Sequence, residues 1–338
     1  MRILKSVQMS MIEDPVRSKF AMAVPILEAT LFSLRADRIQ RFGGIDRVTL
    51  QDLAREFREG DGDAGICFEF AIHEALRQRS PFIFPLAAEV LGDFCNIHGG
   101  SDSILFGPEK DGRIPILESV QDALTDESVL YVGNRGRPPR LRRYIPQVIR
   151  AYRRYEERNR LPRSIRGLWK ADLFLGSLDD QQWVGTSVKI NPTNLEGAQG
   201  LRIGIYPQIN AADRPRRDDA LNLVRLPLPY DGAFMELFYK TFFLVRALLN
   251  SDAQVPPPVH LPDAEDRFVA SQLEIRRDFP VLESMDAIRN MSQRNLLRNE
   301  QITTVAATAA ISEDEGLEDA PLPGLESEFV SLAPEAST

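Results

Sequence analysis

The sequence predicts an α/β (α+β) fold in which a mixed sheet is flanked by helices, with further helices at both ends of the chain. Three observations lead to this prediction. Apolar residues recur at helical spacing between residues 16 and 77, the period changes to alternation from residue 170 to residue 228, and a strongly apolar helix follows at 232–249. The 338 residues, of which 43 % are hydrophobic and 27 % charged, suit two domains or one elaborated domain.

The same patterns locate the individual elements. Helices are expected at 16–39, where Pro25 should kink or divide the helix, and at 49–58, 64–77, 85–95, 145–159, 263–276 and 281–299. Strands are expected at 104–106, 129–132, 170–176, 182–191, 201–207 and 221–228. We therefore divide the chain into a helical N-terminal region (1–60), a core (61–250) with a candidate insertion at 96–144, a C-terminal helical region (251–300) and a disordered acidic tail (301–338).

The composition excludes several classes of protein. Cys67 and Cys95 are too few for a disulfide framework, and together with the three histidines they show no zinc-ligand spacing, so we expect both to be small buried residues. No apolar run reaches the roughly 18 residues of a membrane span, and the start of the chain lacks the apolar core of a signal peptide. There is no Walker-type loop and no Rossmann glycine fingerprint. A soluble, cytoplasmic protein is therefore expected.

The formal net charge of −8 conceals two oppositely charged segments. Residues 313–338 hold eight acids and no Lys or Arg, so residues 1–312 contain 41 acids and 41 bases. Between residues 135 and 170 there are thirteen Lys or Arg and two acids. This segregation points to a polyanionic partner more strongly than the overall charge does.

The two alternating segments between residues 170 and 191 carry the residues that we expect to perform chemistry. Each strand has an apolar side, while the other sides bear Asp172 in the first strand and Ser187 and Lys189 in the second. A hairpin register can bring these three together, and a carboxylate and an amine at a half-buried sheet edge are costly without a ligand. They suit phosphodiester hydrolysis, in which the carboxylate holds a divalent cation and the lysine places or deprotonates a water. The alternative is a surface ion pair worth at most about 1 kcal/mol.

Three segments of the chain resemble the PD-(D/E)XK nuclease superfamily, which has the restriction-endonuclease-like fold. They are Gly65-Ile-Cys-Phe-Glu69, Lys170-Ala-Asp-Leu-Phe-Leu-Gly176 and Thr186-Ser-Val-Lys-Ile-Asn191. The resemblance implies an αβββαβ core in which a helix bears a glutamate and two strands bear the metal aspartate and an (Asp/Glu)-x-Lys triplet. By position it implies that Asp172, Glu69 and the carbonyl of Val188 hold Mg²⁺ or Mn²⁺. Lys189 would be the catalytic lysine, and Ser187 would hold a metal-bound water or a phosphate oxygen.

Ser187 departs from the superfamily pattern, because it stands where a second carboxylate is usual. Either Glu69 or Glu196 supplies the missing carboxylate, or the site is degraded and binds its ligand without cutting it. Glu74 competes with Glu69 for the role of the helix glutamate, since the two lie five residues apart and cannot face one metal together. His73 is expected to be a histidine at the edge of the core that pairs with an acid.

The basic segment 135–170 is expected to bind the phosphate backbone of DNA, because arginine makes bidentate contacts to phosphate. The candidate contacts are Arg140, Arg142, Arg143, Arg150, Arg153 and Arg154; a solvated helix face is the alternative. We therefore predict a metal-dependent DNA endonuclease that forms a homodimer or joins a partner subunit, and the resemblance to the superfamily implies prokaryotic restriction or anti-phage defence as its context. The alternative is a nuclease-fold protein that has lost catalysis and binds nucleic acid or another protein. A further hypothesis has the acidic tail covering residues 135–170 as a DNA mimic.

Overall fold

The observed elements run from helices to strands and back to helices, as predicted. The computed structural model describes residues 14–58, 62–111, 120–133, 137–210, 212–229 and 234–292, which all belong to one compact unit, Glu13–Thr303. The expected tail at 301–338 and the end of the helix expected at 281–299 lie outside the described residues. None of the described helices has the length and hydropathy of a membrane span.

The helices and strands have the following bounds. The helices are α1 (Asp14–Ser33), α2 (Ala36–Arg41), α3 (Leu50–Glu56), α4 (Ala64–Arg77), α5 (Phe84–Cys95), α6 (Gly107–Asp111), α7 (Val120–Ala123), α8 (Leu141–Arg153), α9 (Phe234–Asn250), α10 (Ala264–Glu274) and α11 (Val281–Met291). The strands are β1 (Asp102–Leu105), β2 (Val129–Leu130), β3 (Leu173–Ser177), β4 (Gln182–Val188), β5 (Leu201–Pro207), β6 (Arg216–Asp218) and β7 (Leu223–Leu228).

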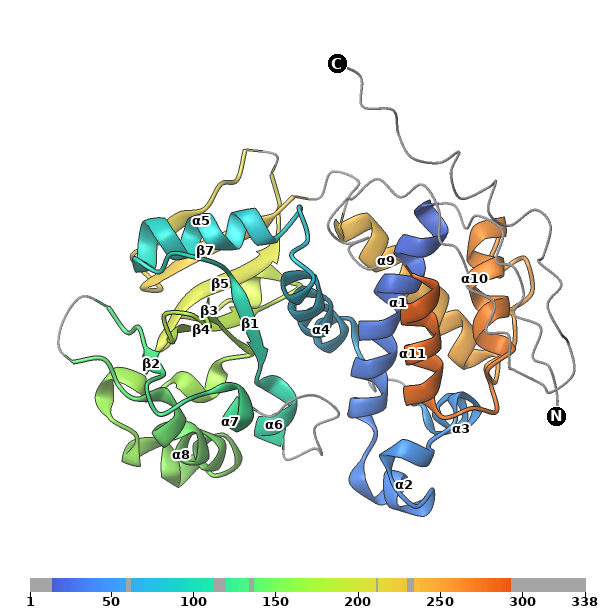
Figure 1. Cartoon of the computed structure of the whole chain (residues 1–338), viewed down its shortest axis with the longest axis horizontal. Helices are drawn as coiled ribbons and strands as arrows, with labels where there is room; N and C mark the ends of the chain where they lie inside the picture. The colour runs from blue at the N-terminus through green and yellow to red at the C-terminus, as the bar shows by residue number, and fades with distance from the viewer. Residues whose placement is uncertain are drawn as a thin grey trace, which may run out of the picture. The chain divides into compact units, whose positions relative to one another are not determined.

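The strands form a seven-stranded mixed sheet in the order β1-β3-β4-β5-β7-β6, with β2 paired to β4 beside this path. The first three strands of the path are antiparallel, whereas β5 is parallel to β4 and β7 is parallel to β5. In Figure 1, α5 lies above the sheet and α8 below it, and α4 stands between the sheet and α1. The candidate insertion at 96–144 contributes β1 and β2 to the sheet, while α6, α7 and the start of α8 in the same span lie outside it.

The first expected helix differs from the observed one in two ways. It ends at Ser33, after which Arg35 is extended and α2 begins. Pro25 lies inside α1 and does not divide it. A proline removes one helical hydrogen bond, but α1 contacts α4, α9, α10 and α11. The burial of the apolar side chains on both sides of Pro25 therefore outweighs the tendency of proline to interrupt a helix.

The basic helix begins and ends earlier than expected, at 141–153 in place of 145–159. Arg154 is extended, and a 3₁₀ helix follows at Tyr155–Arg160. The buried side of α8 consists of Leu141, Ile145, Val148 and Ala151. The helical spacing places Tyr152 and Tyr155 with the apolar residues, but Tyr155 lies beyond the end of the helix and is 75 % exposed, whereas Tyr152 is inside the helix and is 36 % exposed.

Three short elements, α6, α7 and β6, are absent from the sequence prediction. Each has five residues or fewer, too few for a period to be visible. Their positions depend on partners elsewhere in the chain, as β6 shows by pairing with the first three residues of β7. Of the three, α6 matters most for function, since it leads directly from β1 to the candidate site.

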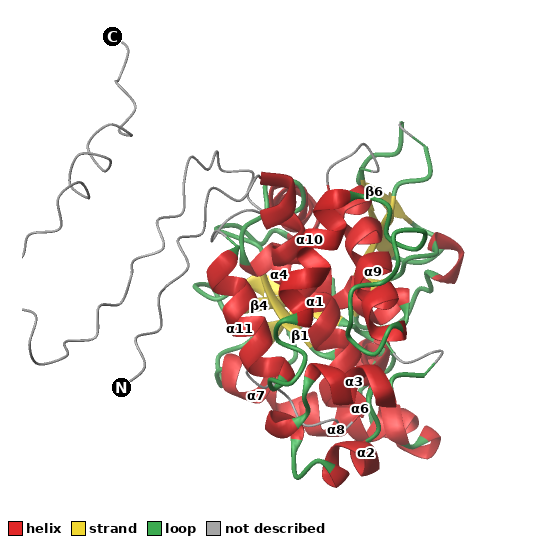
Figure 2. Cartoon of the chain, turned by 90° about the vertical axis from the view of Figure 1, so that its right-hand side faces the viewer, coloured by secondary structure: helices red, strands yellow, loops and turns green. Residues whose placement is uncertain are grey.

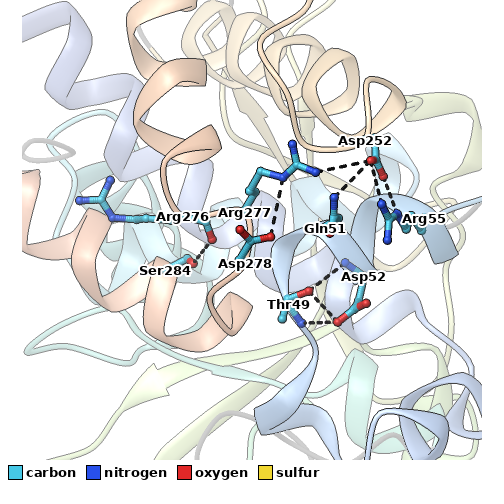
Figure 3. Close-up of polar contacts among 9 residues, drawn as sticks. All are labelled: Thr49, Gln51, Asp52, Arg55, Asp252, Arg276, Arg277, Asp278 and Ser284. Carbon is cyan, nitrogen blue, oxygen red and sulfur yellow. Dashed lines mark hydrogen bonds and ion pairs between the residues drawn. The ribbon is translucent and has the colours of Figure 1, made fainter.

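The helices from the two ends of the described chain pack together, and Figure 2 looks onto α1, α10 and α11 with the strands behind them. The segment before α11 covers the start of α3, where the backbone N–H of Gln51 donates to the carbonyl of Arg277 at 2.8 Å. Figure 3 shows the side chains around this contact. Thr49 and Asp52 form a capping box on α3, and Asp252 accepts hydrogen bonds from Arg55 and Gln51.

Candidate active site

The β3–β4 hairpin determines the position of Asp172. Leu173 pairs with Thr186 in the antiparallel register, and the N–H of Asp172 donates to the carbonyl of Thr186 at 2.8 Å. Asp172 therefore lies beside the end of β4, opposite Ser187 and the residues that follow. This places the aspartate and the Ser-Val-Lys segment together, as the alternation predicts.

One oxygen of Asp172 receives three hydrogen bonds from that segment. Its Oδ2 accepts from Nζ of Lys189 at 2.8 Å, from the backbone N of Val188 at 2.9 Å and from the hydroxyl of Ser187 at 3.2 Å. Asp172 is only 6 % exposed. The donors replace the water that the carboxylate loses on burial. The Ser187 hydroxyl is thus directed at Asp172, and Ser187 helps to hold the carboxylate in place.

A second lysine, which sequence reasoning missed, contacts the other oxygen of Asp172. Nζ of Lys110, in α6, lies 3.4 Å from Oδ1 and donates a short hydrogen bond to the carbonyl of Ala171. The same ammonium lies 5.2 Å from the ring centroid of Tyr152 and 5.7 Å from that of Phe106. Both distances are within the range of cation–π contacts. Sequence spacing gave no signal for Lys110, because α6 is short and lies 62 positions before Asp172.

Glu69 approaches the same group of side chains from α4. Its Oε1 lies 3.8 Å from Nζ of Lys189, and its side chain is 15 % exposed. Gly107 leaves space for this carboxyl, because a Cβ at that position would lie 3.1 Å from Oε2 of Glu69. Lys189 therefore stands within ion-pair distance of both Asp172 and Glu69.

Burial and the neighbouring charges set the protonation of this cluster. Burial, together with the charge of Asp172, raises the pKa of Glu69 well above its usual value. For Lys189, burial opposes the charge, but Asp172 and Glu69 together outweigh it and raise the pKa of the amine. Lys189 is thus an ammonium at neutral pH. It can donate hydrogen bonds and offset negative charge, but it is not poised to remove a proton.

These side chains open onto a cavity of about 560 Å³. Asp172, Glu69, Lys110 and Lys189 line it together with Val188, Asn191 and Tyr152, and the first turn of α4 forms another wall. A volume of this size is typical of small-molecule and substrate sites. The cavity therefore gives a ligand access to the carboxylates, the lysines and an aromatic ring of α8.

The other candidate residues lie elsewhere. Glu74 pairs with Arg77 of its own helix, at 2.9 Å. His73 is buried, and its Nδ1 lies 3.0 Å from the Ser103 hydroxyl, so its hydrogen-bond partner is a serine and not the expected acid; burial lowers its pKa to about 4. Glu196 is exposed and forms a close ion pair with Lys170. Cys67 and Cys95 are free thiols and are buried as expected.

The candidate DNA-binding arginines fall into two groups. Arg140 and Arg142 pair with Glu127 and Asp126 of the preceding loop, at 2.7 Å and 3.3 Å. Arg153 donates to the backbone carbonyls of Glu109 and Lys110, which joins α8 to α6. The remaining candidates, Arg143, Arg150 and Arg154, are exposed. Tyr152, near the C-terminal end of α8, contributes to the wall of the cavity, so this end of the helix adjoins the cavity.

The residues present fit a divalent cation held in the manner of Mg²⁺. Among the described residues there is no group of three or more His, Cys, Asp or Glu that could hold a metal. Mg²⁺, however, is commonly bound by one or two carboxylates, with water and substrate phosphate completing its shell. Asp172 and Glu69 both approach the position of the Lys189 ammonium, so a cation is already favoured between them. The Lys189 side chain is 31 % exposed.

Comparison with known proteins identifies no relative. No family model, no curated protein and no solved structure matches the chain. The chemistry of the cavity therefore has to follow from its own residues.

Proposed function

We propose that the protein is a Mg²⁺- or Mn²⁺-dependent endonuclease that hydrolyses phosphodiester bonds of DNA. The observation that carries this proposal is the meeting of Asp172 and Lys189 at 2.8 Å in a cavity that also receives Glu69. An acid pair and an ammonium at one cavity are what a divalent cation and a developing phosphate charge require. The exposed arginines of α8, whose C-terminal end adjoins the cavity, would supply contacts for the phosphate backbone.

The order of elements around the cavity supports the proposed resemblance to the PD-(D/E)XK superfamily in part. The helix with Glu69 precedes β1, β3 and β4, three antiparallel strands with Asp172 and Lys189 beside the second and third. The helix α5 intervenes before β1, and α6, α7, β2 and α8 intervene between β1 and β3. The next strand, β5, is parallel to β4. Between β4 and β5 there is only a 3₁₀ turn, Pro192–Asn194, where the αβββαβ pattern has a helix. The proposed core therefore departs from that pattern by lacking this helix and by the elements inserted before and after β1.

The side chains divide the work of the proposed reaction. A bound Mg²⁺ would supply a Lewis acid that polarises the scissile phosphate. Asp172 and Glu69 would hold the ion, with the Val188 carbonyl beside them. Lys189, which is protonated at neutral pH, would orient the attacking water and offset the charge that develops on the phosphate. Lys110 and Ser187 hold the Asp172 carboxylate in its orientation.

The test is cleavage of plasmid DNA by the full-length protein with Mg²⁺ or Mn²⁺. Asp172→Asn and Lys189→Met should each lower the cleavage rate by about a hundredfold or more, because each removes a group that acts in the transition state. Lys170→Met is the matched control, since Lys170 lies two residues before Asp172 in the sequence but pairs with Glu196 outside the cavity. It should cleave like the parent protein.

Cleavage that persists in both site variants would rule out this site as the nuclease centre. DNA binding without cleavage in the parent protein would instead favour a second candidate function, in which the fold binds nucleic acid but no longer cuts it. The specific observation behind that candidate is the charge balance of the cavity. Two carboxylates are matched by two lysines, and Ser187 replaces the acid that would have made the site negative.

A further inference from the structure

A second cavity, of about 520 Å³, lies away from the candidate active site. It is lined by residues of α5, of the segment after β2 and of the last three strands, among them Phe94, Tyr131, Val132, Arg202, Arg217 and Asn222. Arg202 stands at the start of β5, whereas Lys189 hydrogen-bonds to the backbone of Ile205 further along the same strand. Because β4 and β5 are parallel, the two cavities lie toward opposite ends of these strands.

Arg202 is the central polar side chain of this cavity. Its Nη1 donates to the side-chain and backbone oxygens of Asn222 at 3.0 Å and 3.4 Å. Its Nε is buried and has no hydrogen-bond partner among the described residues. No carboxylate pairs with Arg202 in the described part of the chain, and burial lowers the pKa of its guanidinium. A half-buried guanidinium held only by an amide and a carbonyl lacks the anion that usually compensates it.

A second guanidinium makes the cavity more positive. Arg217 also lines it and further opposes the charge of Arg202. Asp219, which pairs with Arg217, is exposed and does not contribute to the wall. The hydroxyl of Tyr131 donates to the backbone carbonyl of Phe94 at 3.5 Å, so this phenol is already engaged within the wall. The described wall thus has two guanidinium groups, of which Arg217 has an acidic partner outside the wall, and it contains no acid itself.

The rest of the wall is apolar. Phe94 and Val132 face the cavity with Leu223 and Val224 of β7. The volume exceeds what a single oxyanion would fill and lies in the range of sites for small organic ligands. Two guanidinium groups suit a dianion, and the planar fork of arginine suits phosphate oxygens. A phosphomonoester carries close to two negative charges at neutral pH.

We propose that this cavity binds a small organic phosphate, with the phosphate group on Arg202 and Arg217 and an apolar or aromatic body against Phe94 and Val132. The proposal goes beyond the proposed nuclease function and does not rest on it, because no residue of the candidate active site contributes to this cavity. The phosphate would supply the anion that Arg202 lacks among the described residues, and it would share Arg217 with Asp219.

The test is isothermal titration calorimetry of the full-length protein at fixed salt, with adenosine 5′-monophosphate, inorganic phosphate and adenosine as probes. We expect the monophosphate to bind more tightly than inorganic phosphate, and adenosine to bind least. Arg202→Gln should weaken both phosphates by about tenfold or more, since it removes a hydrogen bond to a charged group. Arg217→Gln should act in the same direction and serves if Arg202→Gln does not fold.

Two controls separate this site from the rest of the molecule. Arg216→Gln removes an equal charge from the adjacent position of β6, whose side chain points to the other face of the strand. Asp172→Asn alters the candidate active site. Neither should change the phosphate affinity. The proposal would be overturned if Arg202→Gln and Arg217→Gln left phosphate binding unaffected. It would also be overturned if the protein bound no phosphate at millimolar concentration. Tighter binding of a 5′-phosphorylated oligonucleotide than of the monophosphate would overturn it as well, because this result would assign the phosphate to nucleic acid.

Discussion

Two buried carboxylates differ in how their charge is compensated. Asp172 has two lysines, a backbone N–H and a hydroxyl around it. Glu28, in α1, is 3 % exposed, and Arg289 of α11 lies 3.8 Å from it. Its Oε1 has no hydrogen-bond partner among the described residues. Burial therefore raises the pKa of Glu28 to about 7, although Arg289 opposes the shift. Neighbouring donors surround the first carboxylate, whereas the surroundings of the second favour its protonated form.

Glu28 should make the stability of the protein fall as the pH rises. The folded-state pKa of about 7 exceeds the ordinary value of 4.5, so the native state holds a proton that the unfolded state releases. The stabilisation is present in full below about pH 4.5 and is lost as the pH rises through about 7, a change of about 3 kcal/mol. Glu28→Gln cannot ionise and should remove this loss. The measurement is the free energy of unfolding from urea denaturation at about pH 5 and about pH 8.

The exposed Glu89 provides the comparison, since Glu89→Gln changes the same chemical group on the surface of α5 and should keep the parent pH dependence. If Glu28→Gln and the parent lose the same free energy between the two pH values, the proton is not on Glu28.

Among the elements, α8 combines a structural and an electrostatic role. One side of the helix packs into the core with Trp183 of β4 and Leu168. The other side carries the arginines, of which Arg140 and Arg142 already have acidic partners and Arg153 binds the backbone of α6. In the proposed complex with DNA, a phosphate backbone would therefore meet chiefly the exposed arginines at positions 143, 150 and 154. Arg153 thus holds α8 against α6, and the same arginine-rich segment would supply the proposed contacts to DNA.

The salt dependence of DNA binding should report on these arginines. Each arginine–phosphate interaction that a substitution removes lowers the slope of log affinity against log salt by about 0.9 for duplex DNA. Replacing Arg143 and Arg150 with glutamine should therefore reduce the magnitude of the slope by about 2. The control replaces Arg35 and Arg47, two exposed arginines in the N-terminal part of the chain, and should leave the slope unchanged. Binding is measured by fluorescence anisotropy of labelled duplex DNA. An unchanged slope in the α8 variant would exclude α8 from the interface.

Across the molecule as a whole, the first and the last described helices depend on one another. α1 contacts α10 and α11 as well as α4 and α9. Lys19 of α1 is buried and lies 2.6 Å from Asp266 and 2.9 Å from Glu265 of α10. Burial disfavours its charge, but the two acids outweigh this and raise the pKa of Lys19. The α10 segment therefore closes a helical layer that begins far earlier in the chain, as the separation of 246 between Lys19 and Glu265 shows.

A double-mutant cycle should detect this dependence. Lys19→Met leaves Asp266 buried without its ammonium and should cost about 3 kcal/mol of unfolding free energy. Adding Asp266→Leu removes the stranded charge, so the double variant should recover part of the loss. The exposed pair Lys240–Glu236 is the control, and Lys240→Met should cost no more than about 0.5 kcal/mol. Strictly additive effects of Lys19→Met and Asp266→Leu, measured by urea denaturation, would show that the two helices are not coupled through this pair.

The order of helices and strands, and the grouping of Asp172, Ser187 and Lys189, could be predicted from the amino-acid sequence alone. Both follow from local rules: the period of apolar residues sets each element, and the parity of positions along a hairpin sets which side chains meet. Three other features became visible only in the folded chain. Lys110 joins the hairpin residues, the cavity receives Glu69 and not Glu74, and α1 continues unbroken through its proline. These features depend on contacts between segments far apart in the chain. A local period specifies which face of an element is apolar, but the element that covers this face is selected by the packing of all the segments together.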